Sequence, residues 1–565
     1  MKKIVFVLFI TILIIQLTPK SFPAADLILL NGKVMTMDSR NPATSSVVIV
    51  GNRIQYTGDR SGALKFRDTN TKVIDLEGRT VIPGLHDAHV HFEAGAALIS
   101  DRLSLRFLNK VQILKKIREA VELSPEGALI KAYSYNHAYF KDKNFPDRHD
   151  LDKVAPKNPV IVTRVDGHSI WVNSITLKMA GITKKTPDPQ GGALLRDSDG
   201  FPTGILKENA ELLVNGVKGP KMVVPGSTGE NKLIKAIRFA NNLGLTSVTT
   251  QGSIKLMKQL DEIDKAGGLT LRFNLWITPA EMKKCVKAGI KFGSGSDKVR
   301  VSFVKIFADG SLGSVSAAFF KPYKNNPSTS GILIHPIEEL NKLIADAHMN
   351  GFQTGTHAIG NRGVHLVLNA VEKAQKKFGQ KGLRHRIEHT QFITDDDLIR
   401  FPELKMVPSM QPTHCTTDLL VVEERVGKER AKQGYRWNSF KQKAIMLGFG
   451  TDWPVEPLDP RRGLYSSVER KNIENGLPEG GWYPEEQINI ADAVKYYTLG
   501  SAYASFNEKR LGSIESQKIA DLTIFDGNIE KLCLKDKKAL LKVPFYKVIM
   551  DGKIICTGKK IKQKI

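Results

Sequence analysis

The chain of 565 residues is 41% hydrophobic and 25% charged, a composition that excludes an intrinsically disordered protein and, at this length, predicts a large core domain with at least one accessory unit. The formal net charge is +25, but the basic residues are spread along the chain and accompany no recognisable nucleic-acid-binding motif, so we expect a diffuse solvated surface and no nucleic-acid partner. The four cysteines lie far apart and form no CxxC pair, which argues against a zinc ribbon and a dense disulfide framework.

Residues 1–25 have the pattern of a secretory signal peptide. Lys2 and Lys3 precede an apolar run that extends to Ile15, and the stretch Ser21-Phe-Pro-Ala-Ala25 follows it. The run is shorter than the about 20 residues of a membrane-spanning helix, so we expect export to the periplasm or to the medium. The alternative is an uncleaved N-terminal anchor. Beyond this segment we expect no membrane contact, because no second apolar run is long enough to cross a bilayer.

Short β-branched runs mark both ends of the remaining chain. Within 26–84 they are 26–32, 46–54 and 72–75, separated by Asn-Gly, Gly-Asn and Glu-Gly turns, and within 501–565 they are 520–525 and 548–555. Two strand-rich ends around a long middle predict one small β-sandwich that is assembled from both termini.

The middle of the chain, residues 85–500, alternates short apolar strands with amphipathic stretches, the pattern of repeated β/α units and of the α/β class. The expected strands are 80–84, 246–250, 269–275, 299–306, 353–357, 386–390, 405–409 and 446–451. Eight is the number that a closed parallel barrel, the (β/α)8 or TIM barrel, requires. Residues from 92 to about 230 then form a long insertion after strand 1, and we expect it to make a lid or subdomain over the barrel mouth.

Ligand-type side chains lie at the ends of several expected strands. His89 and His91 belong to Pro83-Gly-Leu-His-Asp-Ala-His-Val-His91, where residues two apart point to the same face of an extended chain. His357, His389 and Asp452 each close a further strand. A single histidine at such a place is more often structural, but barrel active sites are built at these strand ends. Imidazole and carboxylate together suit zinc and similar ions, with iron, manganese and nickel as alternatives.

Lys305 stands in an otherwise apolar strand, Ser302-Phe-Val-Lys-Ile-Phe307. A buried free ammonium is costly, so such a lysine needs a partner or a chemical modification. Two simpler interpretations remain open from the sequence: the side chain alternates outwards, or it pairs with Asp309 or another acid.

These motifs, together with several others, resemble those of the amidohydrolase superfamily, and within it the YtcJ-like branch that includes N-substituted formamide deformylases. The similarity extends from about residue 26 to the C-terminus. The further matching motifs are Val165-Asp-Gly-His-Ser-Ile-Trp-Val-Asn173, Phe201-Pro-Thr-Gly204 with Glu208, Lys305-Ile-Phe-Ala-Asp-Gly-Ser-Leu-Gly313, His357-Ala-Ile-Gly360, Arg386-Ile-Glu-His389 and Asp452-Trp-Pro-Val455.

The resemblance implies two divalent metal ions, most often zinc, that are held by residues of this chain. His89, His91 and Asp452 would hold one ion, and His357 and His389 the other. Lys305, carboxylated by CO₂, would bridge both ions together with a hydroxide, which resolves the problem of its burial. Asp452 would act as the catalytic base and then as the acid, while His168, Gln411 and His414 resemble family positions near the substrate.

Two departures from the family pattern are visible. The chain has Gly360-Asn-Arg362 where the family usually has Gly-Asp-Arg, and Ile514-Glu-Ser-Gln-Lys-Ile-Ala-Asp521 lacks the usual glycine before its lysine. Neither position is an expected ligand, so we expect effects on substrate preference and none on catalysis itself.

The expected function is hydrolysis of a non-peptide C–N bond, in an amide, formamide or cyclic amide, by a metal-bound hydroxide. One alternative is an ester-cleaving hydrolase with the same site, and another is a non-catalytic exported binding protein of the same fold. The expected partner is a small-molecule substrate, and an oligomer is compatible with the sequence. The natural substrate is not encoded in any motif that we recognise.

Overall fold

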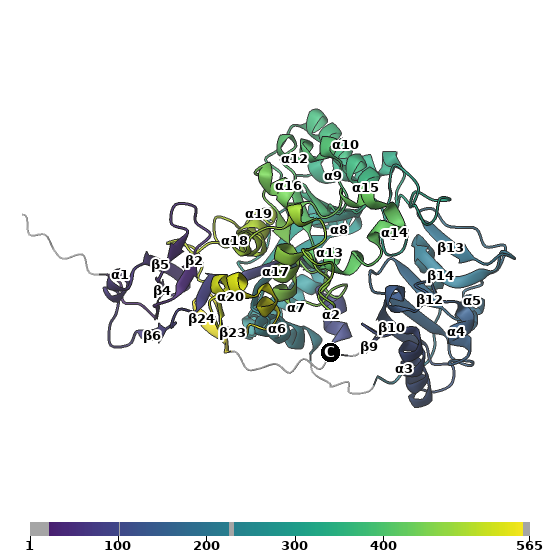
Figure 1. The fold of residues 1–565 in the computed structure, drawn as a ribbon, viewed down its shortest axis with the longest axis horizontal. Helices are drawn as coiled ribbons and strands as arrows, with labels where there is room; N and C mark the ends of the chain where they lie inside the picture. The colour runs from purple at the N-terminus through teal and green to yellow at the C-terminus, as the bar shows by residue number, and fades with distance from the viewer. Residues whose placement is uncertain (1–21, 101, 225–230, 558–565) are drawn as a thin grey trace, which may run out of the picture.

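The computed structural model describes residues 22–100, 102–224 and 231–557. The predicted signal segment therefore lies outside the described residues as far as position 21. Figure 1 shows three units: a β-sandwich where the first strands (purple) meet the last ones (yellow), a central barrel with its helices, and an inserted sheet on the far side of the barrel. The β-sandwich and the insertion thus lie at opposite ends of the barrel.

Eight parallel strands form the central sheet, which is nearly closed into a barrel. In spatial order they are β8 (Leu85–Val90), β15 (Leu245–Gln251), β16 (Arg272–Ile277), β17 (Val299–Phe307), β18 (Thr354–Ala358), β19 (Arg386–His389), β20 (Val407–Met410) and β21 (Gly448–Phe449). The two edges meet beyond β21, where the Asp87 carboxylate accepts hydrogen bonds from Thr451 N at 3.0 Å and Thr451 Oγ1 at 2.6 Å. The predicted (β/α)8 barrel is therefore confirmed.

Helices connect successive barrel strands and cover the outside of the sheet (Figure 1). The longer ones are α6 (Lys232–Asn242), α7 (Ile254–Lys265), α8 (Pro279–Lys287), α9 (Ile337–Met349), α10 (Asn361–Phe378) and α17 (Pro460–Glu469). The starts of α7 and α8 are set by capping residues: the hydroxyls of Ser253 and Thr278 each accept a backbone N–H of the first helical turn. Such caps place the loops that precede these helices, and these loops lie at the carboxyl ends of the strands.

The prediction that residues 80–84 form the first barrel strand was wrong. Residues Thr80–Pro83 form β7, which pairs with β22 (Leu522–Phe525) in a different sheet, and the barrel strand β8 begins only at Leu85. The chain crosses from one unit to the other at Gly84, where an added Cβ would lie 2.1 Å from Thr246 Oγ1. Only glycine allows the backbone to approach the neighbouring strand this closely.

The terminal unit is a β-sandwich built from both ends of the chain, as predicted. One sheet has the order β5 (Arg53–Gly58), β4 (Ser46–Val50), β1 (Leu27–Leu30), β6 (Lys72–Asp75), and the other has β24 (Lys553–Thr557), β23 (Phe545–Met550), β22, β7, β2 (Lys33–Met35), β3 (Ala43–Thr44). Leu29 and Ile49 of the first sheet share one buried cluster with Val81 and Ile524 of the second. The C-terminal strands thus complete a sheet that the N-terminal strands begin.

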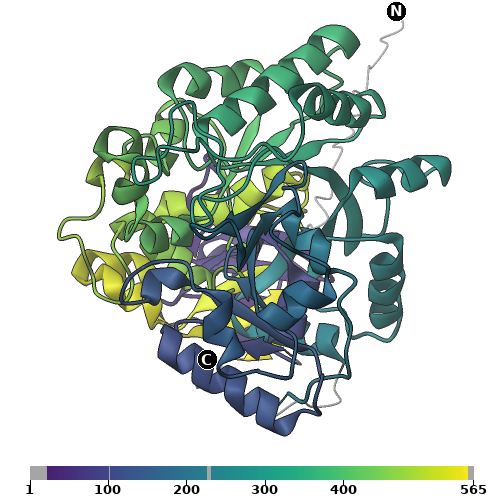
Figure 2. The same ribbon diagram turned by 90° about the vertical axis from the view of Figure 1, so that its right-hand side faces the viewer.

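The insertion after β8 forms a six-stranded sheet of its own. Its order is β13 (Gly192–Arg196), β14 (Pro202–Glu208), β12 (Ser169–Val172), β11 (Val160–Arg164), β10 (Ile130–Tyr135), β9 (Leu103–Ser104), with α3 (Lys110–Leu123), α4 (Arg148–Asp152) and α5 (Ser174–Met179) packed on it. In Figure 2 the insertion (blue) lies in front of the barrel. It covers the end of the barrel at which the strands carry the ligand-type side chains.

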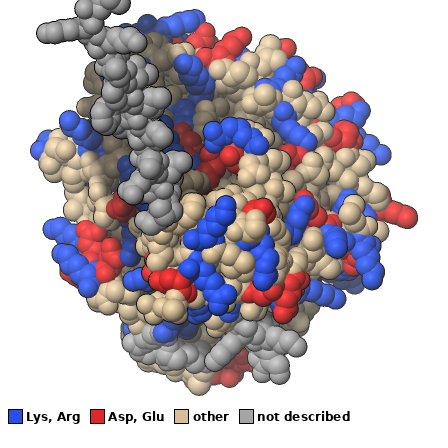
Figure 3. All heavy atoms as spheres, turned by 90° about the vertical axis from the view of Figure 1, so that its left-hand side faces the viewer, with Lys and Arg blue, Asp and Glu red and all other residues tan. Residues whose placement is uncertain are grey.

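On the outer face of the β-sandwich end, basic and acidic side chains are interleaved and do not gather into one patch (Figure 3). Among the described residues, no helix has the length and apolar character needed to cross a membrane. All four cysteines lie in the described part of the chain, and none of them forms a disulfide.

Candidate metal centre

The barrel brings the predicted ligands together at one end. His89, Lys305, His357 and His389 lie on the barrel strands themselves, while Asp452 follows β21. One atom each from His89, His389 and Asp452 forms a group in which all distances are within 4.8 Å, and all three residues are buried. Ligand atoms from two strands and from the loop after a third therefore converge on one small volume.

The other three predicted ligands adjoin this group. His91 Nε2 lies 3.2 Å from Asp452 Oδ1, and Lys305 Nζ lies 3.3 Å from His89 Nε2. The rings of His357 and His389 have centroids 4.5 Å apart. The structure thus places all six predicted residues around a single centre.

Hydrogen bonds fix which nitrogen of each buried histidine is free to bind a metal. His89 Nδ1 lies 2.5 Å from a carboxylate oxygen of Glu388, and His389 Nδ1 lies 2.8 Å from the amide oxygen of Gln411. These oxygens can only accept, so Nδ1 carries the proton and Nε2 keeps its lone pair. His357 Nε2 lies 3.1 Å from a backbone carbonyl oxygen. By the same argument, Nε2 of this residue carries the proton and Nδ1 is the nitrogen that is free to bind a metal.

The charges at this centre also suit a cation. Burial lowers the pKa of His89 to about 4 and holds the pKa values of His357 and His389 well below the usual value, so all three imidazoles are neutral. For Asp452, burial favours the protonated form, but the hydrogen bond from the neighbouring His91 opposes it, and the pKa lies well below the usual range. Neutral imidazoles and an ionised carboxylate are the donor set of zinc and related divalent ions.

Lys305 faces the metal centre. Its side chain is 5% exposed and its Nζ lies over the rings of Trp276 and Phe307, at 4.5 and 5.0 Å from their centroids. Asp309 is not its partner, because that carboxylate accepts three backbone N–H bonds from neighbouring loops. Burial lowers the pKa of Lys305 to about 8, which makes a neutral amine accessible. The outward orientation and the pairing with Asp309 are therefore wrong, while the carboxylates of Glu388 and Asp452 favour the charged form of Lys305.

Two residues that sequence analysis did not single out support His89 from behind. Glu388, two residues before His389 on β19, accepts hydrogen bonds from the Arg386 guanidinium at 2.7 and 2.9 Å. Arg386 also donates to Ser409 Oγ at 2.7 Å. This chain of buried charges orients the imidazole of His89, as carboxylates commonly do for metal-binding histidines. Both residues stand in the Arg386-Ile-Glu-His389 motif, but the contact of Glu388 with His89 and that of Arg386 with the Ala88 carbonyl join distant strands.

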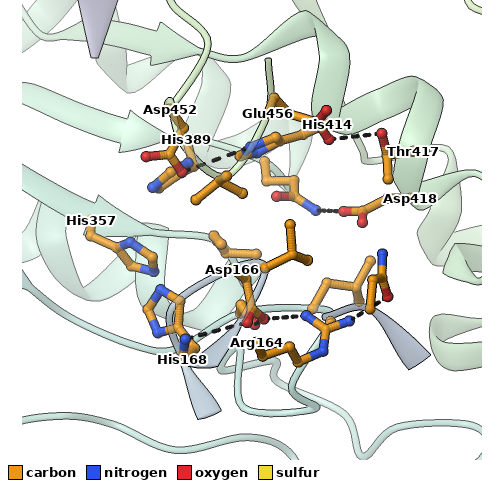
Figure 4. A pocket seen from close by; sticks show the side chains of 18 residues that line it. Arg164, Asp166, His168, His357, His389, His414, Thr417, Asp418, Asp452 and Glu456 are labelled. Atoms are coloured by element: carbon orange, nitrogen blue, oxygen red, sulfur yellow. Dashed lines mark hydrogen bonds and ion pairs between the residues drawn. The ribbon is translucent and has the colours of Figure 1, made fainter. Parts of the chain in front are cut away.

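A cavity of about 270 Å³ lies above the centre, between the barrel and the insertion. Lys305, His357 and Asp452 of the barrel line it, together with Tyr133 and His168 of the insertion. Figure 4 shows the adjoining part of this space, with His389, His414 and Asp452 on one side and Arg164, Asp166 and His168 on the other. A small substrate in the cavity would therefore touch both units.

The predicted substrate-binding residues differ in their placement. His168 Nδ1 pairs with Glu208 at 2.8 Å; burial alone would lower its pKa, but this carboxylate raises it to about 9, so His168 is a cation in the cavity wall. The ring of His414 is stacked on His389 and its Nε2 lies 3.7 Å from Asp452 Oδ2. Gln411 lies behind His389 and is buried, a position that suits orientation of that ligand.

A parallel barrel with neutral imidazoles and a carboxylate at the ends of its strands is the architecture of a barrel enzyme with a metal centre. Residues 72–556 match the profile of the amidohydrolase family. The chain belongs to this family.

Individual relatives agree with the family. The Bacillus subtilis (strain 168) protein YtcJ, named as an amidohydrolase, is 31% identical over 93% of this chain and 98% of its own length. The N-substituted formamide deformylase of Arthrobacter pascens is 24% identical over 89% of this chain and 93% of its own. The crystal structure of an uncharacterized metal-dependent hydrolase from Pyrococcus furiosus covers 89% of this chain and 99% of its own, with 28% identity and a TM-score of 0.65. Family and relatives together support a metal-dependent hydrolase.

Proposed function

We propose that the protein is an exported hydrolase of non-peptide C–N bonds in a small molecule such as an N-substituted amide, a formamide or a cyclic amide. The observation that carries the proposal is the convergence of His89, His389 and Asp452 beside the buried amine of Lys305. The similarity to an N-substituted formamide deformylase supports the C–N bond as the one that is cleaved.

The donor set would hold two divalent ions, for which we propose zinc. His89, His91 and Asp452 would hold one ion, and His357 and His389 the other. The neutral Lys305 amine would add to the carbon of CO₂ and release one proton, which gives a carbamate. This group carries a negative charge and two oxygens, so it would bridge the ions. Burial of Nζ away from water lowers its pKa and so favours the uncharged amine that this reaction needs.

When bound, the ions would lower the pKa of a water molecule to near neutrality and polarise the substrate carbonyl. Asp452 would take a proton from the attacking water and transfer it to the leaving nitrogen, so that the departing group leaves as a neutral amine. His414, 3.7 Å from Asp452 Oδ2, would position this carboxylate. The cationic His168 would bind the carbonyl or another electron-rich group of the substrate, and the insertion would keep bulk water out.

Asp452→Asn tests the proposed chemistry. The amide is nearly isosteric but cannot accept the proton, so we expect a loss of about 10²–10⁴-fold in kcat/KM for an amide substrate with the fold retained. The assay is a parallel panel of N-substituted formamides, cyclic amides, and carboxylic and phosphate esters, with circular dichroism as the control for folding. Turnover of amides that is unchanged in the variant would refute the role of Asp452. Turnover of esters alone would replace the C–N bond by a C–O or P–O bond, and no turnover at all would favour a binding protein.

A further inference from the structure

A second cavity, of about 260 Å³, lies between the insertion and the barrel, apart from the metal centre. From the insertion it is lined by residues of β14 and of the segment 137–145, and from the barrel by the loop 315–326 and by α14 (Val422–Val426). Figure 1 shows α14 next to the inserted sheet. None of the six candidate metal ligands lines this cavity.

Lys207 on β14 lines this cavity. Its side chain is nine-tenths buried, with 7% of its surface exposed, and its Nζ lies 5.0 Å from the ring centroid of Phe145. Among the described residues, no carboxylate forms an ion pair with it, and its neighbour Glu208 binds His168 instead. A buried ammonium without an anionic partner is unfavourable, so the cavity calls for a negative charge.

A second buried cation increases this excess of positive charge. Arg425 on α14 uses its guanidinium for the backbone carbonyls of Leu312 and Gly313, and its Nη2 lies 3.2 Å from His137 Nε2. The other ring nitrogen of His137 lies 3.3 Å from Arg164 Nε. A neutral imidazole has one acceptor nitrogen, so only one of these two guanidinium contacts can be a hydrogen bond.

Side chains at the rim of the cavity do not neutralise the charges of Lys207 and Arg425. Lys143 is exposed and adds a further cation, whereas Glu424 is the only carboxylate among the described residues that line the cavity. Glu424 is exposed, its Oε1 accepts from Asn325 Nδ2 at 3.5 Å, and it makes no ion pair with Lys207 or Arg425. Three cations therefore face one carboxylate, which bonds to an amide of the cavity wall and to neither buried cation.

We propose that this cavity is a binding site for a small anion that carries a carboxylate or phosphate group, with the Lys207 ammonium as its main contact and Lys143 at the entrance. The cavity is slightly smaller than the about 300–1,000 Å³ of typical ligand pockets, which fits a small anion. The anion would also stabilise the contact between the insertion and the barrel. Arg425 and His137 connect the cavity to Arg164. The Nη1 atom of Arg164 lies 2.6 Å from Asp166 Oδ2. Ser314 of the barrel donates to the same carboxylate at 2.9 Å.

The test is isothermal titration calorimetry of the metal-loaded protein with inorganic phosphate and, in parallel, with acetate, which distinguishes the two anion chemistries. Lys207→Met keeps the length of the side chain and removes its charge. We expect saturable binding of at least one anion to the wild type, and a loss of about tenfold or more in the variant, equivalent to about 1.4 kcal/mol. The matched control is Lys184→Met, because Lys184 lies on the same unit over the ring of Phe201 at 5.1 Å but is exposed and outside the cavity.

Phosphate can also bind to metal ions, so Asp452→Asn is titrated as well. Binding that persists in Asp452→Asn and is weakened in Lys207→Met supports the proposal. Binding that is lost in Asp452→Asn and unchanged in Lys207→Met belongs to the metal centre and overturns it, as does the absence of saturable binding of either anion. If Lys207→Met does not fold, Lys143→Met at the exposed rim takes its place, with an expected weakening of about twofold to fivefold; equal affinity in that variant would count against the site.

Discussion

Glu388→Gln removes one charge from the buried chain that supports His89. The Glu388 side chain is fully buried and its two oxygens accept from Arg386 at 2.7 and 2.9 Å and from His89 Nδ1 at 2.5 Å. Glutamine has nearly the same shape but leaves the Arg386 guanidinium without a counter-ion. Breaking one partner of a buried pair costs about 3–5 kcal/mol of unfolding free energy. The side-chain amide can also turn an N–H towards His89, which would move the ring proton to Nε2 and block the metal-binding nitrogen.

Two measurements separate these effects. Urea denaturation of the metal-free protein reports the lost free energy of unfolding, and competition with a chelator reports metal affinity, which we expect to fall by about 10–100-fold. Glu372→Gln is the matched control, because Glu372 also pairs with an arginine, Arg400 at 2.8 Å, but its side chain is 35% exposed. We expect that control to change stability by less than about 1 kcal/mol. If Glu388→Gln behaves like the control in both assays, the supporting role of Glu388 is refuted.

Three further predictions concern the cavity and the proposed metal. Glu208→Gln removes the carboxylate that raises the pKa of His168 to about 9. The stabilisation from this ion pair is fully present below pH ~6.5 and disappears as the pH rises through about 9. Thermal unfolding across pH should therefore show a loss of stability in the variant at pH 6 and little loss above pH 10. Gly313→Ala would place a Cβ 2.3 Å from Arg164 Nη1 and should lower the free energy of unfolding by about 1–3 kcal/mol. The control Gly216→Ala, at a position that faces open space, should leave this free energy unchanged. Unfolding curves of the two variants that coincide would contradict the prediction. Removal of metal by a chelator should lower the unfolding midpoint, and added zinc should restore it; a midpoint that does not respond would contradict a bound ion.

Much of the fold could be predicted because its patterns are local. Strand periodicity and turn residues gave the barrel and the β-sandwich, and a long segment without barrel strands gave the insertion. The prediction failed at the start of the barrel, because the sequence pattern of residues 80–90 is that of one extended stretch. A change of sheet at Gly84 depends on the close approach of Thr246, which is a long-range contact. No local pattern contains such a contact.

The candidate site was predictable for a related reason. Ligands at the ends of successive strands converge in a closed parallel barrel whatever lies between them, so their positions followed from the strand pattern. The partners behind them did not, because the contact of Glu388 with His89 joins residues 299 positions apart. Gln411 is a similar case: its motif suggested substrate contact, while its place behind His389 depends on packing. The uncompensated charge of Lys207 is likewise visible only once the insertion is seated on the barrel.

The central claim is a metal centre at the barrel mouth in which Lys305 takes part. It is tested most directly by the metal content of the purified mature protein, determined by plasma mass spectrometry alongside Lys305→Ala. We predict about two divalent ions per chain in the wild type, as in two-metal hydrolytic sites, and a clear fall in the variant. One ion or none, with the same content in Lys305→Ala, would contradict the bridging role of this lysine.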